Sequence, residues 1–196
     1  YFDDFRTNAR NVLGCRGIQV NVHPDMESGL QYHFSYLWPH EYWTACSGWV
    51  YQPFYEHYLV TGDRNFLRNR LIPGLKEIAL FYEDFLTETD ERGYYIFVPS
   101  YSPENCPSNL ITSVTINATM DIAVCKEVLT NLVKFCEELG VESENVPKWK
   151  AMLAKLPPYM FDEQGALREW AWPGLEERYD HRHLSHLYGV WPGDEI

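Results

Sequence analysis

The segment Pro99–Pro107, with the sequence PSYSPENCP, holds one carboxylate in a stiff setting. Three prolines in nine residues exclude a helix there. Pro103 fixes one of its own backbone angles and biases Ser102 toward an extended conformation, so Glu104 follows on a rigid mount. A general acid needs such a mount, because its carboxyl must lie within hydrogen-bond reach of a leaving oxygen. Most loop carboxylates are instead solvated turn or capping residues, and the segment alone leaves both interpretations open.

The segment Asp180–His186, with the sequence DHRHLSH, is dense in groups that bind polar ligands. His183 and His186 would share one face of a helix, an arrangement that suits a metal site. Arg182 would oppose a cation there, and no H-E-x-x-H pattern is present, so we predict no metal site. These groups suit hydrogen bonds to a polyhydroxylated ligand, or they brace a neighbouring acid. A buried polar contact between loop and helix is the alternative.

A third set of candidates mixes aromatic, acidic and imidazole side chains. Aromatic rings could face the C–H surfaces of a sugar, or they could pack at the start of a helix. The set consists of His23, Asp25, Trp38, His40, Glu41, Trp43 and Trp49. Its composition is typical of a carbohydrate cleft but does not decide between the two interpretations.

Other chemistries lack their motifs. No G-x-S-x-G elbow supports a serine nucleophile, and no glycine-rich phosphate-binding pattern supports a nucleotide or dinucleotide cofactor. The five cysteines are an odd number without C-x-x-C spacing, so we expect buried free thiols rather than zinc or a disulfide framework. The formal net charge of −12 disfavours nucleic acid as a partner. No run of 18 apolar residues indicates a membrane span.

Helices must position these candidates. Apolar residues recur at helical spacing over residues 2–13, 41–60, 75–86, 117–140 and 143–156. Gly14 and Gly140 supply C-terminal stops, and Asp63 is predicted to cap a new helix after the second one ends. Pro53 should kink or divide the second helix.

The remaining segments predict loops and short extended pieces. Residues 17–39 form a long loop, residues 94–100 a strand-like run, residues 159–170 a hairpin, and residues 181–193 a loop that leads into a helix. No linker divides the chain, so residues 1–196 are predicted to be a single domain. Helices joined by alternating short and long connections predict an all-α fold of antiparallel helix pairs, as in an α/α toroid or a superhelix.

Six motifs, taken in order, resemble the catalytic domain of glycoside hydrolase family 95, which contains α-L-fucosidases and α-L-galactosidases. They are LGCRG (13–17), EHYLVTGDRNFLR (56–68), PSYSPEN (99–105), TMDIAVCKEVLTN (119–131), GALREW (165–170) and HRHLSHLYGVWPG (181–193). Together they span nearly the whole chain. The resemblance implies part of an (α/α)6 toroid and an exo-acting, inverting glycosidase that is α-L-fucosidase-like or α-L-galactosidase-like, with an oligosaccharide or glycoconjugate substrate and no cofactor.

The resemblance also implies roles for individual residues. The glutamate of the SPEN-type loop is the family's general acid, which gives that role to Glu104. The arginine and histidine before SHLYG contact the sugar, which implies Arg182 and His183. Asp25 matches an aspartate that shapes the same pocket. Trp43 and Trp49 are the tryptophans that WTACSGW (43–49) retains from the family's WPxGGAW, and we expect both to bind substrate.

Other parts of the family pattern differ or are absent. The motif HHNTDIW appears here as NVHPDME (21–27). The water-activating asparagines and the partner aspartate would fall outside residues 1–196, so we expect a fragment of a larger catalytic domain with half of the catalytic machinery. The alternatives are a non-catalytic carbohydrate-binding relative and another α/α-toroid enzyme, such as a phosphorylase or lyase.

Overall fold

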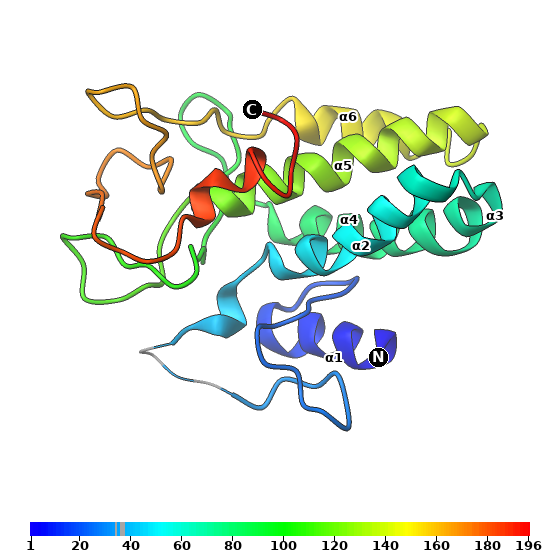
Figure 1. Cartoon of the computed structure of the whole chain (residues 1–196), viewed down its shortest axis with the longest axis horizontal. Helices are drawn as coiled ribbons and strands as arrows, with labels where there is room; N and C mark the ends of the chain where they lie inside the picture. The colour runs from blue at the N-terminus through cyan, green and yellow to red at the C-terminus, as the bar shows by residue number, and fades with distance from the viewer. Residues whose placement is uncertain (34, 36–37) are drawn as a thin grey trace.

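The computed structural model describes residues 1–33, 35 and 38–196. The regular elements of these residues are helices (Figure 1). The elements are α1 (Phe2–Leu13), η1 (His40–Tyr42), α2 (Cys46–Thr61), α3 (Arg64–Phe66), η2 (Leu67–Leu71), α4 (Ile72–Phe85), α5 (Thr119–Leu139), α6 (Val146–Leu153) and η3 (Ser185–Gly189). The predicted all-α class is confirmed.

The helix ends follow from local sequence. Gly14 and Gly140 adopt φ of 69° and 64°, the left-handed conformation that closes a helix and that glycine reaches without a Cβ clash. Asp63 caps α3, because its side chain accepts hydrogen bonds from the backbone N–H groups of Asn65 and Phe66. All three predicted helix boundaries are therefore confirmed.

Four helices lie side by side as antiparallel pairs, α2 with α4 and α5 with α6 (Figure 1). Short connections join them at one end, over residues 62–63 and 140–145. At the other end the long segments 86–118 and 154–184 gather beside the start of α5. The predicted alternation of short and long connections is present. It places the loops that carry Glu104, Arg182 and His183 at one end of the helices.

Helix α5 is the centre of the core and packs against α2, α4, α6 and η3. Its inward side chains are almost fully buried: Ile122, Val124, Leu129, Leu132 and Phe135. Gly48 on α2 lies directly against α5, since a Cβ at that position would come within 2.3 Å of a methyl carbon of Val124. The glycine therefore permits the close approach of the two helices.

Three segments differ from the expectation in detail. Helix α2 runs unbroken from Cys46 to Thr61 through Pro53, so the predicted division does not occur; the proline ring lies on the exposed side of the helix, away from its packed face. The strand-like run 94–100 and the hairpin 159–170 form isolated antiparallel bridges, such as Phe161 with Leu167, rather than extended strands among the described residues. Helix α6 is shorter than predicted.

The cysteines are free thiols, as predicted. Four are buried, and Cys106, in the Glu104 loop, is half-buried. Within the described residues, no helix has the length and apolar character needed to cross a membrane.

Candidate active site

The loop that carries Glu104 is fastened to the start of α5. Ser100 and Thr115 exchange two backbone hydrogen bonds of 2.9 and 2.7 Å. Asp121, in the first turn of α5, accepts hydrogen bonds from the Ser100 hydroxyl at 2.5 Å and from the Tyr101 N–H at 3.2 Å. The rigid loop that the three prolines predict is therefore held further by polar contacts to the buried carboxylate of Asp121.

Asp121 also joins this loop to the opposite wall of the site. Its other oxygen accepts a hydrogen bond from the Ala45 N–H at 2.9 Å, in the segment that carries Trp43. Burial raises the pKa of Asp121 to about 6, and the hydrogen bond from Ser100 opposes that rise. One buried carboxylate thus sets the spacing of the two segments.

Glu104 meets Arg182 and His183, which are 78 and 79 residues further along the chain. Arg182 Nη2 lies 2.5 Å from Glu104 Oε2, and His183 Nε2 lies 3.8 Å from the same oxygen. Arg182 Nη1 also contacts His183 Nε2 at 2.5 Å. The three residues that the sequence singled out from two distant motifs therefore form one polar group.

A hollow of about 860 Å³ opens beside this group, within the ~300–1,000 Å³ typical of ligand pockets. Glu104 and His183 line it together with Trp43 and Trp49. The two indole rings are 5.1 Å apart between centroids and are tilted. Trp43 is buried while Trp49 is half exposed, so the pair forms an apolar wall that runs from the interior to the rim.

His40 lines the same hollow, but the family motifs did not single it out. It is buried, and neither ring nitrogen has a hydrogen-bond partner among the described residues. Burial lowers its pKa, and the neighbouring His23 ring, 4.8 Å away between centroids, lowers it further. A neutral imidazole with unused nitrogens is a polar group available to a ligand.

Asp25 does not line the hollow. It is exposed, and its Oδ2 accepts hydrogen bonds from the N–H groups of Glu27 at 3.1 Å and Ser28 at 3.0 Å. The Ser28 hydroxyl donates to the same oxygen. The carboxylate of Asp25 therefore closes its own turn.

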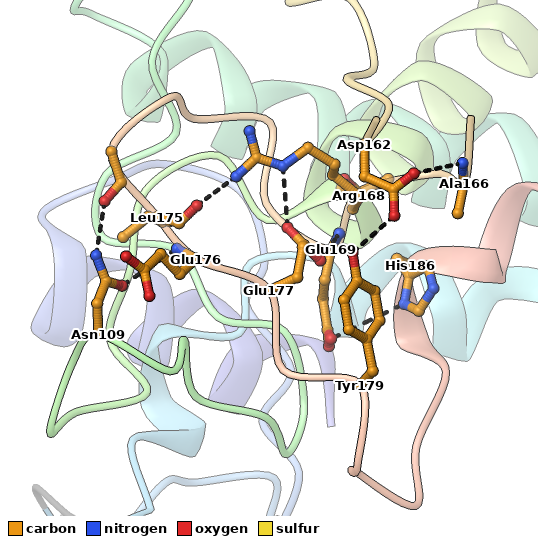
Figure 2. A network of polar contacts seen from close by, with 12 residues as sticks. Asn109, Asp162, Ala166, Arg168, Glu169, Leu175, Glu176, Glu177, Tyr179 and His186 are labelled. Atoms are coloured by element: carbon orange, nitrogen blue, oxygen red, sulfur yellow. Dashed lines mark hydrogen bonds and ion pairs between the residues drawn. The ribbon is translucent and has the colours of Figure 1, made fainter. Parts of the chain in front are cut away.

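A polar network lies in the segment that follows α6 (Figure 2), and its member Glu169 contacts Ser102 and Asn105 of the Glu104 loop. Arg168 Nε pairs with Glu177 at 3.1 Å, and Glu177 accepts a hydrogen bond from the Glu169 N–H at 2.8 Å. Tyr179 donates to Asp162 at 2.7 Å and so ties the same segment to the turn at residues 162–165. The sequence did not indicate this network, because its contacts join the predicted hairpin at residues 159–170 to Glu177 and Tyr179, for which no element was predicted.

The histidines do not assemble a metal centre. Across residues 1–33, 35 and 38–196, no group of three or more His, Cys, Asp or Glu side chains could hold a metal ion. Arg182 occupies the place beside His183, as its interaction with that ring shows.

Comparisons with known proteins give one family and one fold. A family model described as the glycosyl hydrolase family 95 catalytic domain matches residues 2–196. Alpha-L-fucosidase 2 from Arabidopsis thaliana is 36% identical over 158 residues, which are 79% of this chain and 19% of that protein. The chain thus spans about a fifth of this curated relative.

A solved structure, the putative kojibiose phosphorylase from human microbiome, has a similar fold. The TM-score is 0.62 at 14% sequence identity, over 86% of this chain and 23% of that chain. The antiparallel helix pairs described above are therefore part of an α/α toroid.

Proposed function

This chain belongs to glycosyl hydrolase family 95, and we propose that it forms part of the active site of an exo-acting, α-L-fucosidase-like glycosidase. The family and the fucosidase relative support a glycosidase. The observation that carries the assignment to particular residues is the contact of Glu104 with Arg182 and His183 at the edge of a hollow lined by two tryptophans. An acid to protonate the leaving oxygen and donors to bind sugar hydroxyls are part of what glycoside hydrolysis requires, and aromatic faces suit the C–H surface of a sugar.

Glu104 is the general acid of this proposal. Its carboxyl gives a proton to the glycosidic oxygen while the bond between that oxygen and the anomeric carbon breaks. Water adds to the anomeric carbon from the opposite face, and the proton it loses passes to a base supplied by the part of the protein outside this chain. The configuration at the anomeric carbon is inverted.

Arg182 and His183 hold the sugar in this scheme. The Arg182 side chain is mostly exposed, and its guanidinium contacts the carboxylate of Glu104. Sugar hydroxyls compete with Glu104 for those N–H donors, so binding draws the cation away from the acid. Trp43 and Trp49 offer apolar faces to the C–H surface of the sugar. Asp25 shapes the surrounding loop through its own turn.

The substitution Glu104→Gln in the full-length protein tests the assignment. We expect kcat/KM for an alkyl α-L-fucoside, whose leaving group needs a proton, to fall by about 10²–10⁴-fold, the usual contribution of general acid catalysis. A 2,4-dinitrophenyl fucoside, whose leaving group departs without one, should lose far less. Glu144→Gln, an exposed position between α5 and α6, is the matched control. Retention of most activity on the alkyl substrate by Glu104→Gln contradicts the assignment.

A further inference from the structure

Glu169 carries a buried carboxylate directly behind the Glu104 loop. The residue is 2% exposed and follows Arg168 into the isolated bridge between Ala118 and Trp170. Figure 2 shows its side chain extending past Glu177 toward His186. It does not border the hollow that Glu104 lines, so a substrate in that hollow would not touch it.

Both carboxylate oxygens of Glu169 accept hydrogen bonds from residues that flank Glu104. The Ser102 hydroxyl donates to Oε1 at 2.7 Å, and the Asn105 amide donates to Oε2 at 2.6 Å. Asn105 has a fixed orientation, because its Oδ1 accepts from the Cys106 N–H and its Nδ2 also donates to the Arg178 carbonyl. The carboxylate of Glu169 therefore binds the loop two residues before Glu104 and one residue after it.

The surroundings of Glu169 favour these hydrogen bonds to Ser102 and Asn105 over an ion pair. Glu177 accepts from the Glu169 backbone N–H and is itself paired with Arg168. His186 Nδ1 lies 3.9 Å from Oε2 and has no hydrogen-bond partner among the described residues. Burial raises the pKa of Glu169 to about 7, while burial lowers that of His186. Among the described residues, no lysine or arginine pairs with the carboxylate of Glu169, and its shortest side-chain contacts are those to Ser102 and Asn105 of the Glu104 loop.

The same loop is held from a second side. Ser185, the first residue of η3, donates its hydroxyl to the Pro103 carbonyl, immediately before Glu104. Glu104 thus lies between two anchors, one on η3 and one on Glu169, and only the second binds both of its flanks.

We propose that Glu169 is a positioning residue for the general acid: it fixes Ser102 and Asn105 so that the carboxyl of Glu104 points at the leaving oxygen. The inference rests on the proposed function, since it gives Glu104 the role of acid. Misplacement of a catalytic group by about 1 Å costs on the order of 10²-fold in rate, which is the size of effect such an anchor controls.

Leaving-group dependence separates positioning from a purely structural role. The test uses the full-length protein with Glu169→Ala, which removes both acceptors, and Glu169→Gln, which retains one carbonyl oxygen for Asn105 while the Ser102 hydroxyl can rotate and accept from the new amide. We expect Glu169→Ala to lose about 10²-fold in kcat on the alkyl fucoside and less than about 5-fold on the dinitrophenyl fucoside. Glu169→Gln should lose less than about 10-fold on the alkyl substrate.

Ser102→Ala keeps the test decisive if Glu169→Ala does not fold. It deletes one donor with little change in volume and should show the same selective loss on the alkyl substrate, in smaller measure. Glu176→Gln is the matched control, because this exposed glutamate lies next to Glu177 and its hydrogen bonds among the described residues are with Ser108 and Asn109. Its ratio of the two rates should equal that of the wild type.

Glu104→Gln distinguishes failure of this inference from failure of the proposed function. If Glu104→Gln does not discriminate between the leaving groups, Glu104 is not the acid, and the positioning role falls with it. If Glu104→Gln discriminates but Glu169→Ala and Ser102→Ala reduce both rates equally, only the positioning role is overturned. In the double variant Glu104→Gln/Glu169→Ala, the positioning role requires no further selective loss.

Discussion

Arg182 has two partners that make different demands on it. It contacts Glu104 in this structure, and in the proposed reaction it must bind sugar hydroxyls instead. The planar guanidinium can do both because it presents several N–H donors in fixed directions. At the scale of single residues, the proposed binding of substrate is therefore a change of partner at Arg182 rather than the filling of a preformed contact.

Removal of Arg182 should weaken binding more than turnover. We expect Arg182→Ala in the full-length protein to raise KM for an aryl fucoside by about 10- to 100-fold, from loss of charge-assisted hydrogen bonds of about 1.5–3 kcal/mol. Arg182→Lys should recover only part of this, because lysine lacks the planar fork. Steady-state kinetics give KM and kcat, with Arg178→Ala as control, since the ion pair of its side chain among the described residues is with Asp180, at 4.0 Å. An unchanged KM in Arg182→Ala contradicts a sugar-binding role.

Asp121 should make stability depend on pH. Its pKa rises from 3.8 in the unfolded chain to about 6 in the folded protein because the carboxylate is buried. Between these values the folded state binds more protons than the unfolded state, so the free energy of unfolding falls as pH rises from about 4 to about 6. The full effect is on the order of 3 kcal/mol.

Comparison of the wild type with Asp121→Asn isolates this group, because the amide does not titrate. Urea unfolding of the full-length proteins at pH 4 and pH 7.5 gives the two free-energy differences. The wild type's free energy of unfolding relative to Asp121→Asn should be higher at pH 4 than at pH 7.5. A difference that does not change with pH would show that Asp121 has the same pKa in both states.

At the scale of elements, the contact between α2 and α5 depends on one missing side chain. Gly48→Ala adds a methyl group that would meet Val124 at 2.3 Å. Alanine favours a helix over glycine by about 1 kcal/mol, but overpacking a core typically costs about 1–3 kcal/mol, and we expect the second effect to dominate. Thermal unfolding should show a lower Tm.

The surroundings of Gly48 supply controls for this prediction. Gly174→Ala should be nearly neutral, because a Cβ there meets nothing closer than 3.9 Å. Val124→Ala combined with Gly48→Ala should recover part of the lost stability, since it removes the methyl groups in the way. Additive losses in the double variant would mean that the two residues do not meet.

Local features were predictable from the sequence because they depend on a few neighbouring residues. Gly14, Gly140 and Asp63 act through the backbone of their own turns, and each helix boundary is confirmed. The unbroken α2 was not predictable, because it depends on Pro53 falling on the exposed side of a packed helix. Helix propensity predicts which segments are helical, whereas tertiary packing decides where a helix tolerates a proline.

Some residues of the candidate site were likewise predictable from the sequence, and others were not. The motifs singled out Glu104, Arg182 and His183, and the fold brings them together. Asp121 and Glu169 were not predicted to act in the site, because a carboxylate in a helix or loop is ordinarily solvated and nothing in its neighbours reveals burial. Their contacts with the Glu104 loop appear only when the long loops at one end of the helices are placed against each other.

At the scale of the whole molecule, the proposed reaction needs both an acid and a base, and in our proposal this chain supplies the acid. Its antiparallel helix pairs are part of a toroid, and the hollow beside Glu104 is bounded here by α2, the Glu104 loop and η3. We expect the base of the proposed mechanism in another part of the protein. The stereochemistry of the product therefore tests the complete site, because it depends on water reaching the face opposite to Glu104.

An inverting mechanism requires about 6.5–9.5 Å between the acid and the base, which leaves room for that water. With an aryl α-L-fucoside and the full-length protein, proton NMR during the first minutes of turnover should show the β-anomer of L-fucose before mutarotation produces the α-anomer. A retaining mechanism, with a nucleophile about 5–5.5 Å from the acid, would release the α-anomer first. Early α-anomer would contradict the proposed water attack while leaving the role of Glu104 as proton donor intact, since both mechanisms need one.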